Sequence, residues 1–241
     1  MLDPGFYNMD CMAGMKEFPD GFFDLAIVDP PYGDATEEQG DEPTWERFGG
    51  RFRKYRQNNA GGGYSPDAVE RTGGTWAAKY GKKIAAWDVA PKEDYFKELF
   101  RVSRHQIIWG GNYFSLPPTR CFIVWRKLTI SENFSMAMAE YAWTNFNENA
   151  KVFECMPQGT QQEQRFHPTQ KPVKLYQWTL ARYAKEGYKI LDTHCGSASS
   201  LIACHRAGMP FWGFEIDPEY YAKAKERLDA EMNQMTIFDL I

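Results

Sequence analysis

The stretch YKILDTHCGSASSLIACHRAGMPFWGFEIDPEYY, residues 188–221, contains the pattern that decides the fold. Its apolar runs at Lys189–Leu191 and Phe211–Phe214 predict two strands, and a helix is predicted between them over Ser199–Ala207. A second helix is predicted over Pro218–Ala230, because an aspartate that suits the N-cap precedes it and proline suits the first turn. Alternation of strands and helices is typical of a parallel sheet with right-handed crossover connections.

The rest of the chain repeats this alternation, apart from one long segment. Further strands are predicted at Phe6–Met9, Leu25–Val28, Gln106–Trp109, Phe122–Trp125, Ala139–Trp143 and Val152–Cys155. Further helices are predicted over Cys11–Phe18, from Pro91 onward and over Val173–Ala184. Continuous apolar strands suit a sheet that is covered on both faces. The sequence therefore predicts an α/β fold, Rossmann-like and doubly wound around a mostly parallel sheet, with residues 1–241 forming one domain.

Residues 33–88 do not follow the alternation, and they are too many for a simple connection between a strand and a helix. We interpret them as an insert that is either functional or disordered. From Asp34 to Glu46 there are six acidic residues and no basic one, whereas the next ten residues hold five bases and no acid. These bases are Arg47, Arg51, Arg53, Lys54 and Arg56, with Phe48, Phe52 and Tyr55 among them. The cluster is either a solvated loop or a surface that contacts phosphate.

Charge and cysteine content limit the class of protein. The formal net charge is −4, so a nucleic-acid partner would need a local basic surface. Five cysteines, scattered and without a close pair, indicate a reducing compartment and argue against a disulfide framework or a zinc site. The sequence shows no signal-peptide pattern at its start and no apolar stretch of membrane length. We therefore expect a cytoplasmic protein that has no metal site.

The turn between the strand predicted at Lys189–Leu191 and the helix predicted over Ser199–Ala207 has the features of a cofactor site. Gly196 and the small residues after it let a ligand approach the backbone at a helix N-terminus, and Glu215 follows nineteen residues later, where dinucleotide folds place a ribose-binding acid. A dinucleotide site uses three glycines, but this turn has one, and Asp192 precedes it. An acid there repels pyrophosphate and suits the ammonium and sulfonium groups of S-adenosylmethionine. This favours S-adenosylmethionine over NAD, while an ordinary connection without a ligand stays open.

The stretch FDLAIVDPPYGD, residues 23–34, predicts a reactive corner at the end of a buried strand. Two prolines remove two N–H donors, which leaves the Asp29 carboxylate and the Pro30 carbonyl as acceptors beside the ring of Tyr32. Acceptors and an aromatic face suit a planar exocyclic amine. Stabilising a pyramidal amine nitrogen returns its lone pair for attack, and that stabilisation grows toward the transition state. The alternative is that the prolines only end the strand.

Three motifs together resemble the amino-group DNA methyltransferases: DPPY at 29–32, HPTQKP at 167–172 and LDTHCGSASS at 191–200. The segments IIWGGNYF and AEYAWTNF, which begin at Ile107 and Ala139, are also similar to phage-type members. Aspartate in the first position of the tetrapeptide is typical of the adenine-specific enzymes, whereas serine is commoner in those that act on the 4-amino group of cytosine. The catalytic motif precedes the cofactor motif, as in the circularly permuted beta class.

This resemblance implies a role for individual residues. It implies that Asp29, Pro30, Pro31 and Tyr32 hold and activate the amine, with the tyrosine ring stacked on a flipped base. It implies that Glu215 binds the ribose hydroxyls, that Asp10 meets the adenine amine of the cofactor, and that Lys171 lies near its methionine part. The full set expected to contact S-adenosylmethionine is Asp10, Cys11, Asp29, Lys171, Asp192, Thr193, His194, Cys195, Gly196, Ser197, Glu215, Ile216 and Asp217.

The function expected from the resemblance is transfer of a methyl group to the 6-amino group of adenine in double-stranded DNA, with the insert contacting the DNA. Methylation of cytosine or of RNA is an alternative. The chain departs from the family pattern at Thr193, His194 and Ala198, which leaves open a DNA-binding protein of the same fold without catalysis. An oxidoreductase is disfavoured because the glycines of a dinucleotide site are missing. The resemblance also leaves open a homodimer and a partner nuclease.

Overall fold

The computed structural model describes residues 1–33, 89–131, 137–157 and 165–234. The chain divides into two compact units, residues 1–30 with 92–241 and residues 31–91. Apart from Gly33, the expected insert lies outside the described residues, and so do its five basic residues. The architecture below is that of the first unit.

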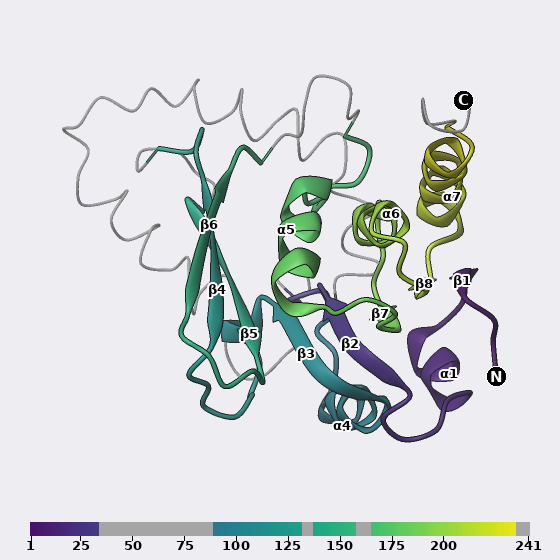
Figure 1. Cartoon of the computed structure of the whole chain (residues 1–241), viewed down its shortest axis with the longest axis horizontal. Coiled ribbons are helices and arrows are strands. Elements are labelled where there is room, and N and C mark those ends of the chain that lie inside the picture. Colours follow the sequence, from purple (N-terminus) through teal and green to yellow (C-terminus); the bar gives the residue numbers. More distant parts are fainter. Residues whose placement is uncertain (34–88, 132–136, 158–164, 235–241) are drawn as a thin grey trace. The chain divides into compact units, whose positions relative to one another are not determined.

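A mixed sheet forms the centre of the first unit (Figure 1). Its strands lie in the order β1-β8-β7-β2-β3-β5-β4-β6. Among the described strands β5 alone is antiparallel to its neighbours, β3 and β4, and the other neighbouring strands pair in parallel. The strands are β1 (Gly5–Asn8), β2 (Phe23–Val28), β3 (Ser103–Trp109), β4 (Phe122–Lys127), β5 (Ala139–Thr144), β6 (Lys151–Cys155), β7 (Ile190–Asp192) and β8 (Phe211–Glu215).

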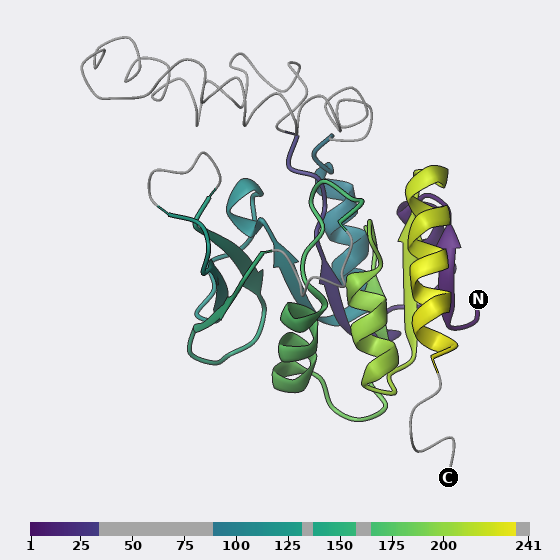
Figure 2. The same cartoon turned by 90° about the horizontal axis from the view of Figure 1, so that it is seen from above.

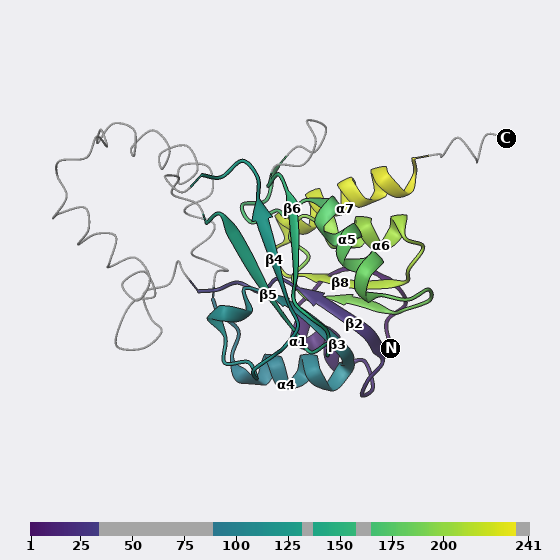
Figure 3. The same cartoon turned by 60° about the vertical axis from the view of Figure 1, so that its left-hand side comes forward.

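Helices cover both faces of the sheet (Figures 1 and 3). The helices are α1 (Cys11–Lys16), α4 (Glu93–Val102), α5 (Val173–Tyr183), α6 (Ser199–Arg206) and α7 (Pro218–Met232), with a short 3-10 helix η1 (Gly111–Tyr113). Figure 2 shows α5, α6 and α7 side by side on one face. Strand β2 serves both layers, because Leu25 and Ile27 join the core under these three helices while Ala26 and Val28 join the core with α1 and α4. The doubly wound α/β fold predicted from the sequence is confirmed.

The local signals explain where the elements begin. Asp217 caps α7 by accepting hydrogen bonds from the backbone N–H groups of Glu219 and Tyr220, at 2.8 and 3.0 Å. The helix predicted from Pro91 begins at Glu93 instead, because Lys92 still has an extended backbone with ψ of 169°. Strand β3 begins at Ser103, three residues before the expected Gln106, and the other predicted strands and helices appear within about two residues of their expected bounds.

The first strand of the unit pairs with one of its last strands, as a circular permutation requires. Strand β1, the first of the chain, pairs in parallel with β8, which comes near its end. Helix α7 follows β8 and packs back on β1: the Tyr221 hydroxyl donates to the Phe6 carbonyl at 3.3 Å, and their ring centroids lie 4.7 Å apart. The strand that would follow α7 in an unpermuted chain therefore stands at the start of this one. Within the described residues, none of the helices has the length and apolar character needed to cross a bilayer.

Candidate active site

Four acidic residues lie at the carboxyl ends of four neighbouring parallel strands. In sheet order they are Asp10 after β1, Glu215 at the end of β8, Asp192 at the end of β7 and Asp29 after β2. Parallel neighbours end at the same edge of a sheet, and open α/β sheets bind ligands at that edge. Residues far apart in the sequence are thereby collected into one acidic row, which favours a cationic ligand.

Asp192 is buried at the mouth of the turn that follows β7. Its Oδ1 accepts a hydrogen bond from the backbone N–H of His194 at 3.0 Å, and the Ser200 hydroxyl donates to its Oδ2. Burial raises the pKa of this carboxyl to about 7; the two hydrogen bonds oppose the rise, and the charges of Asp29 and Glu215 add to it. Because those two carboxylates influence Asp192, the ends of β2, β7 and β8 form one electrostatic unit.

The turn itself uses left-handed backbone conformations. Gly196 has φ of 51°, and Ala198, the N-cap residue of α6, has φ of 58°, which is uncommon for a residue other than glycine. The buried ring of His167 lies directly behind the turn, since a Cβ on Gly196 would be 3.1 Å from it. Burial lowers the pKa of His167 to about 3, and the charges of Arg165 and Lys171 act in the same direction. His167 is therefore a neutral support for the turn.

Glu215 ties β8 to this turn through both of its carboxylate oxygens. Oε2 accepts a hydrogen bond from the Gly196 N–H at 2.8 Å, and Oε1 accepts one from the Asp217 N–H at 2.9 Å. Each carboxylate oxygen has a second lone pair, so Glu215 retains the capacity to accept from hydroxyl groups. The side chain of Ile216 is mostly exposed beside it. Asp217 is used as the cap of α7, which is a structural role that the sequence also predicts.

A chain of polar contacts fixes the residues that depart from the family pattern. The Tyr95 hydroxyl of α4 lies 2.6 Å from Thr193 Oγ1, and this oxygen lies 2.9 Å from His194 Nδ1. His194 Nε2 lies 4.0 Å from the Cys11 sulfur, and Asp10 caps the same helix α1 by accepting from the Ala13 N–H at 3.0 Å. Burial lowers the pKa of His194 to about 4 and raises that of the Cys11 thiol to about 12. Both are therefore neutral at pH 7.

Asp29 is held by a buried network of opposite charges. The Lys171 ammonium, whose side chain is 4% exposed, donates a hydrogen bond to Asp29 Oδ2 and lies 3.2 Å from Glu140 Oε2 on β5. Lys127, 6% exposed at the end of β4, lies 2.5 Å from Glu140 Oε1. Burial alone would lower the pKa of Lys171, but the two carboxylates outweigh it and raise the value. Burial would raise the pKa of Glu140, and the two lysines outweigh it and lower the value.

The first unit thus brings Asp10, Cys11, Asp29, Lys171 and Glu215 to one edge of the sheet, together with the turn from Asp192 to Ser197. Pro30 follows Asp29 within the first unit, whereas Pro31 and Tyr32 belong to the second unit, and the roles expected for the site residues stay predictions.

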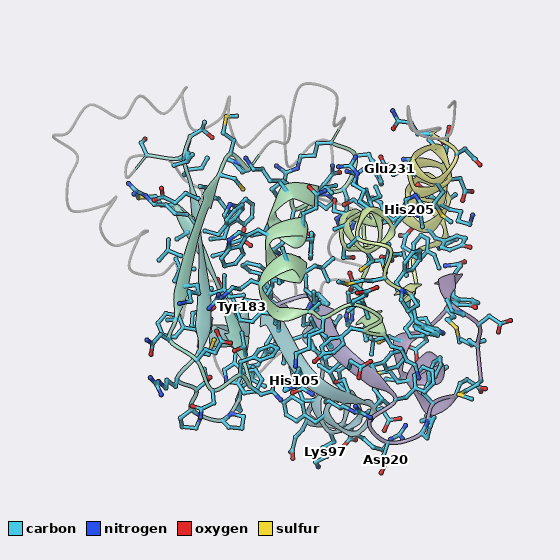
Figure 4. The ribbon with its side chains drawn as sticks, viewed as in Figure 1. Asp20, Lys97, His105, Tyr183, His205 and Glu231 are labelled. Carbon is cyan, nitrogen blue, oxygen red and sulfur yellow. The ribbon has the colours of Figure 1, made fainter. Side chains whose placement is uncertain are left out.

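The two other histidines, His105 and His205, lie at the ends of β3 and α6 that are away from the candidate site (Figure 4). His105 is near the start of β3 with its ring stacked on Phe146 at 4.5 Å, and His205 is in the last turn of α6. In the ranges that the structure describes, no group of three or more His, Cys, Asp or Glu side chains could hold a metal ion.

Sequence reasoning missed several residues of this edge. Glu140 lies in AEYAWTNF, a segment that resembles the family, yet nothing in the segment shows that β5 places this acid against Lys171. Tyr95 lies in the helix predicted from Pro91 onward, yet nothing in the sequence shows that its hydroxyl reaches the turn. Ser200 lies in the motif LDTHCGSASS and Lys127 follows the strand predicted at Phe122–Trp125, but neither position indicates which carboxylate the side chain contacts.

Comparison with known sequences identifies the family. The sequence model of the N6/N4 methylase family, described as DNA methylase, matches residues 76–226, more than half of the chain. The chain belongs to this family of amino-group DNA methylases. The resemblance seen in the three motifs is thereby confirmed at the level of the family, which includes enzymes for both amino groups.

Two curated relatives show how far the similarity extends. The methylase is 25% identical over 228 residues to the type II methyltransferase M2.DpnII of Streptococcus pneumoniae, which covers 86% of this chain and 83% of that relative. It is 38% identical over 73 residues to the type II methyltransferase M.HpaI of Haemophilus parainfluenzae, which covers 30% of this chain and 23% of that relative. The match therefore spans less than a quarter of the second protein.

Solved structures share the fold of the methylase. The PvuII DNA methyltransferase, described as cytosine-N4-specific, matches with a TM-score of 0.56 at 12% identity and covers 97% of this chain and 92% of its own. A protein from Thermus thermophilus named as a DNA modification methylase, solved in complex with S-adenosyl-L-methionine, matches with a TM-score of 0.52 at 17% identity over 95% and 96% of the two chains. At identities this low, the matches show only that the folds are similar.

Proposed function

We propose that this methylase transfers a methyl group from S-adenosylmethionine to the 6-amino group of adenine in DNA. The observation that carries the proposal is the placement of Asp29 and Asp192 at the ends of neighbouring parallel strands, which the register Ala26↔Leu191 aligns. One strand ends in the motif expected to hold the acceptor amine. The next ends in the turn expected to hold the methyl donor. A transfer reaction needs these two sites side by side.

The residues at the ends of β1, β7 and β8 fit a cationic nucleoside. Asp192 offers a carboxylate to the ammonium group, Glu215 retains acceptor capacity for ribose hydroxyls, and Asp10 supplies an acceptor for an adenine amine. The cofactor would supply an electrophilic methyl group on its sulfonium. The neutral imidazoles of His167 and His194 add no positive charge to the site at pH 7, so they do not oppose binding of a cation.

Asp29 and Lys171 would act on the acceptor amine. The ammonium of Lys171 keeps the Asp29 carboxylate in place as a charged acceptor for the amine N–H groups. As the nitrogen bonds to the methyl group, the bond from that methyl group to the sulfonium sulfur would break, and its electron pair would stay on the sulfur, which leaves as a neutral thioether. The nitrogen then carries a positive charge and its protons become acidic. The carboxylate then stabilises this charge and accepts a proton, so no stronger base is required before attack.

Adenine is the proposed base because aspartate begins the tetrapeptide at 29–32. A base inside a duplex cannot reach such a site, so the proposal includes flipping of the target base out of double-stranded DNA. The basic cluster from Arg47 to Arg56 is the proposed phosphate contact. A cytoplasmic location belongs to the same proposal.

The test is a methyl-transfer assay with purified protein, S-adenosylmethionine carrying a labelled methyl group, and unmethylated DNA of mixed sequence. We expect the label in N6-methyladenine after digestion to nucleosides. Asp29→Asn removes the charged acceptor and should lower the rate by about 10²–10³-fold, as loss of one transition-state contact usually does. Asp20→Asn, at the exposed position labelled in Figure 4, is the matched control and should keep the rate within about twofold.

Each contrary result has a distinct meaning. Label in N4-methylcytosine would overturn the choice of base and keep the reaction. Transfer to RNA but not to DNA would overturn the substrate class. Cofactor binding and DNA binding without transfer would show a DNA-binding protein of this fold that lacks catalysis.

A further inference from the structure

Glu140 holds two buried ammonium groups at the edge of the candidate site. Its two carboxylate oxygens face different lysines, with Lys127 2.5 Å from Oε1 and Lys171 3.2 Å from Oε2. The lysine side chains are 6% and 4% exposed, and their ammonium groups also lie over the rings of Trp125 and Trp109, at 5.1 and 5.5 Å. Lysine is almost never this buried without a charged partner.

The charges around Lys171 come from several elements. Asp29 follows β2 and Glu140 lies on β5, and both act on Lys171, while Lys127 at the end of β4 contacts Glu140. His167, before α5, lies close enough to be influenced by Lys171 but is neutral at pH 7. The network of Lys127, Glu140, Lys171 and Asp29 balances two positive and two negative charges, with the lysines almost fully buried and the Asp29 and Glu140 side chains 13% and 25% exposed. Taking one carboxylate out of such a network leaves an uncompensated buried ammonium, which is strongly unfavourable.

We propose that Glu140 is a positioning residue for methyl transfer, which acts by holding the Lys171 ammonium charged and against Asp29. The inference rests on the proposed function, because it gives Asp29 its role as the acceptor. Glu140 is the second anchor of Lys171, from the opposite side of β3, so it fixes the direction in which the lysine approaches the Asp29 carboxylate. Lys127 in turn fixes Glu140.

An ion pair that also involves strand β4 is exposed and serves as a comparison. Arg126 and Glu154 lie 2.9 Å apart on β4 and β6, one residue before Lys127, but their side chains are 60% and 47% exposed. Pairs that are this exposed contribute little, because water screens them. Glu154→Gln is therefore a matched control for Glu140→Gln, because both variants replace a paired glutamate by glutamine.

The first measurement is the ionisation of Lys171, which does not depend on activity. Glu140→Gln keeps the shape and removes the charge, so Lys171 loses one of the two carboxylates that raise its pKa against the effect of burial. In lysine side-chain NMR spectra, with the Lys171 signal assigned through Lys171→Met, we expect its pKa to fall by about one unit or more. Glu154→Gln should leave it unchanged. An unchanged pKa in Glu140→Gln would overturn the proposal.

The second measurement separates positioning from binding. In Glu140→Gln we expect kcat to fall about tenfold at pH 7 and further at a pH above the pKa that the NMR titration gives for Lys171 in the variant, while KM for S-adenosylmethionine stays within about twofold. The sign follows from the lysine: wild-type Lys171, with its raised pKa, keeps its proton to a higher pH than the variant, which loses it as pH rises through the lowered value. A fall in kcat that is the same below and above that pKa would contradict the proposal.

The double variant Glu140→Gln/Lys127→Met separates a loss of kcat caused by mispositioning of Lys171 from one caused by lost folding stability. It removes the lysine that Glu140→Gln leaves without a carboxylate, so it should regain most of the folding stability lost in the single variant. We expect kcat to stay low, because Lys171 still lacks its second anchor. Full recovery of kcat would show that Glu140 serves only Lys127 and would overturn the proposal. If wild type transfers no methyl group but the Lys171 pKa shifts as expected, the proposed function fails and the coupling of Glu140 to Lys171 stands.

Discussion

Asp192 is a buried carboxyl whose charge destabilises the free protein. Its folded pKa, about 7, lies above the ordinary value of 3.8, so the folded state binds the proton more tightly than the unfolded state does. The unfavourable contribution is absent below pH 4, grows between pH 4 and 7 and is complete above pH 7. Asp192→Asn removes this contribution. The free energy of unfolding of the variant, taken relative to that of wild type, should therefore rise by about 2 kcal/mol between pH 5 and pH 8. Urea denaturation at both pH values checks this, and an equal change in the two proteins would contradict it.

At the residue scale the sequence predicts the motif acids and misses their partners. Asp29, Asp192 and Glu215 follow predicted strands, so the rule that parallel strands end at one edge is enough to bring them together. Glu140 could not be predicted in this way, because β5 reaches the site only through an antiparallel pairing with β3 that the alternation of strands and helices does not reveal. The contact made by the Tyr95 hydroxyl could not be predicted for a different reason: the apolar periodicity of a helix does not distinguish tyrosine from phenylalanine.

At the scale of elements, the close approach of α1 to β8 places Asp10 at the site. Gly14 of α1 faces the fully buried ring of Phe214, and a Cβ built on it would be 2.5 Å from that ring. Helix α1 can therefore lie flat on the strand only with glycine here. The local pattern predicts a helix over Cys11–Phe18, and the observed helix ends two residues earlier, at Lys16. The distance between this helix and the sheet depends on Gly14 and Phe214, which lie far apart in the sequence, so it does not follow from the local pattern.

Gly14→Ala should push α1 away from β8 and lower the free energy of unfolding by about 1–3 kcal/mol, as overpacking of a core usually does. Since Asp10 caps this helix, affinity for S-adenosylmethionine should fall as well. Gly5→Ala in β1 is the matched control, because its Cβ would meet only the Tyr7 side chain at an ordinary 3.4 Å, and its effect should stay under about 0.5 kcal/mol. Urea denaturation and calorimetry measure the two effects. Equal loss of stability in both variants would contradict the packing explanation.

At the scale of the whole molecule, charge is divided unevenly between the two units. Residues 31–91 hold nine acidic and nine basic residues, so the formal net charge of −4 lies on the unit that carries the acidic edge. That edge attracts a cationic cofactor and repels phosphate. A methylase of DNA must then obtain its phosphate contacts from a local cluster. The cluster at 47–56 is the densest one in the sequence, and it lies outside the described residues.

Replacing all five bases of this cluster (Arg47, Arg51, Arg53, Lys54 and Arg56) by serine should therefore weaken DNA binding in a salt-dependent way. Each lost phosphate contact reduces the slope of log affinity against log salt by about 0.9, and DNA affinity near 0.1 M salt should fall at least tenfold. Affinity for S-adenosylmethionine should not change, because the residues expected to hold it lie on the other unit. Changing Lys79, Lys82 and Lys83 to glutamine in the same unit is the control and should alter the slope less. If the serine variant keeps the wild-type slope in a titration of fluorescent duplex DNA at several salt concentrations, phosphate is contacted elsewhere, and the exposed basic side chains of the first unit become the candidates.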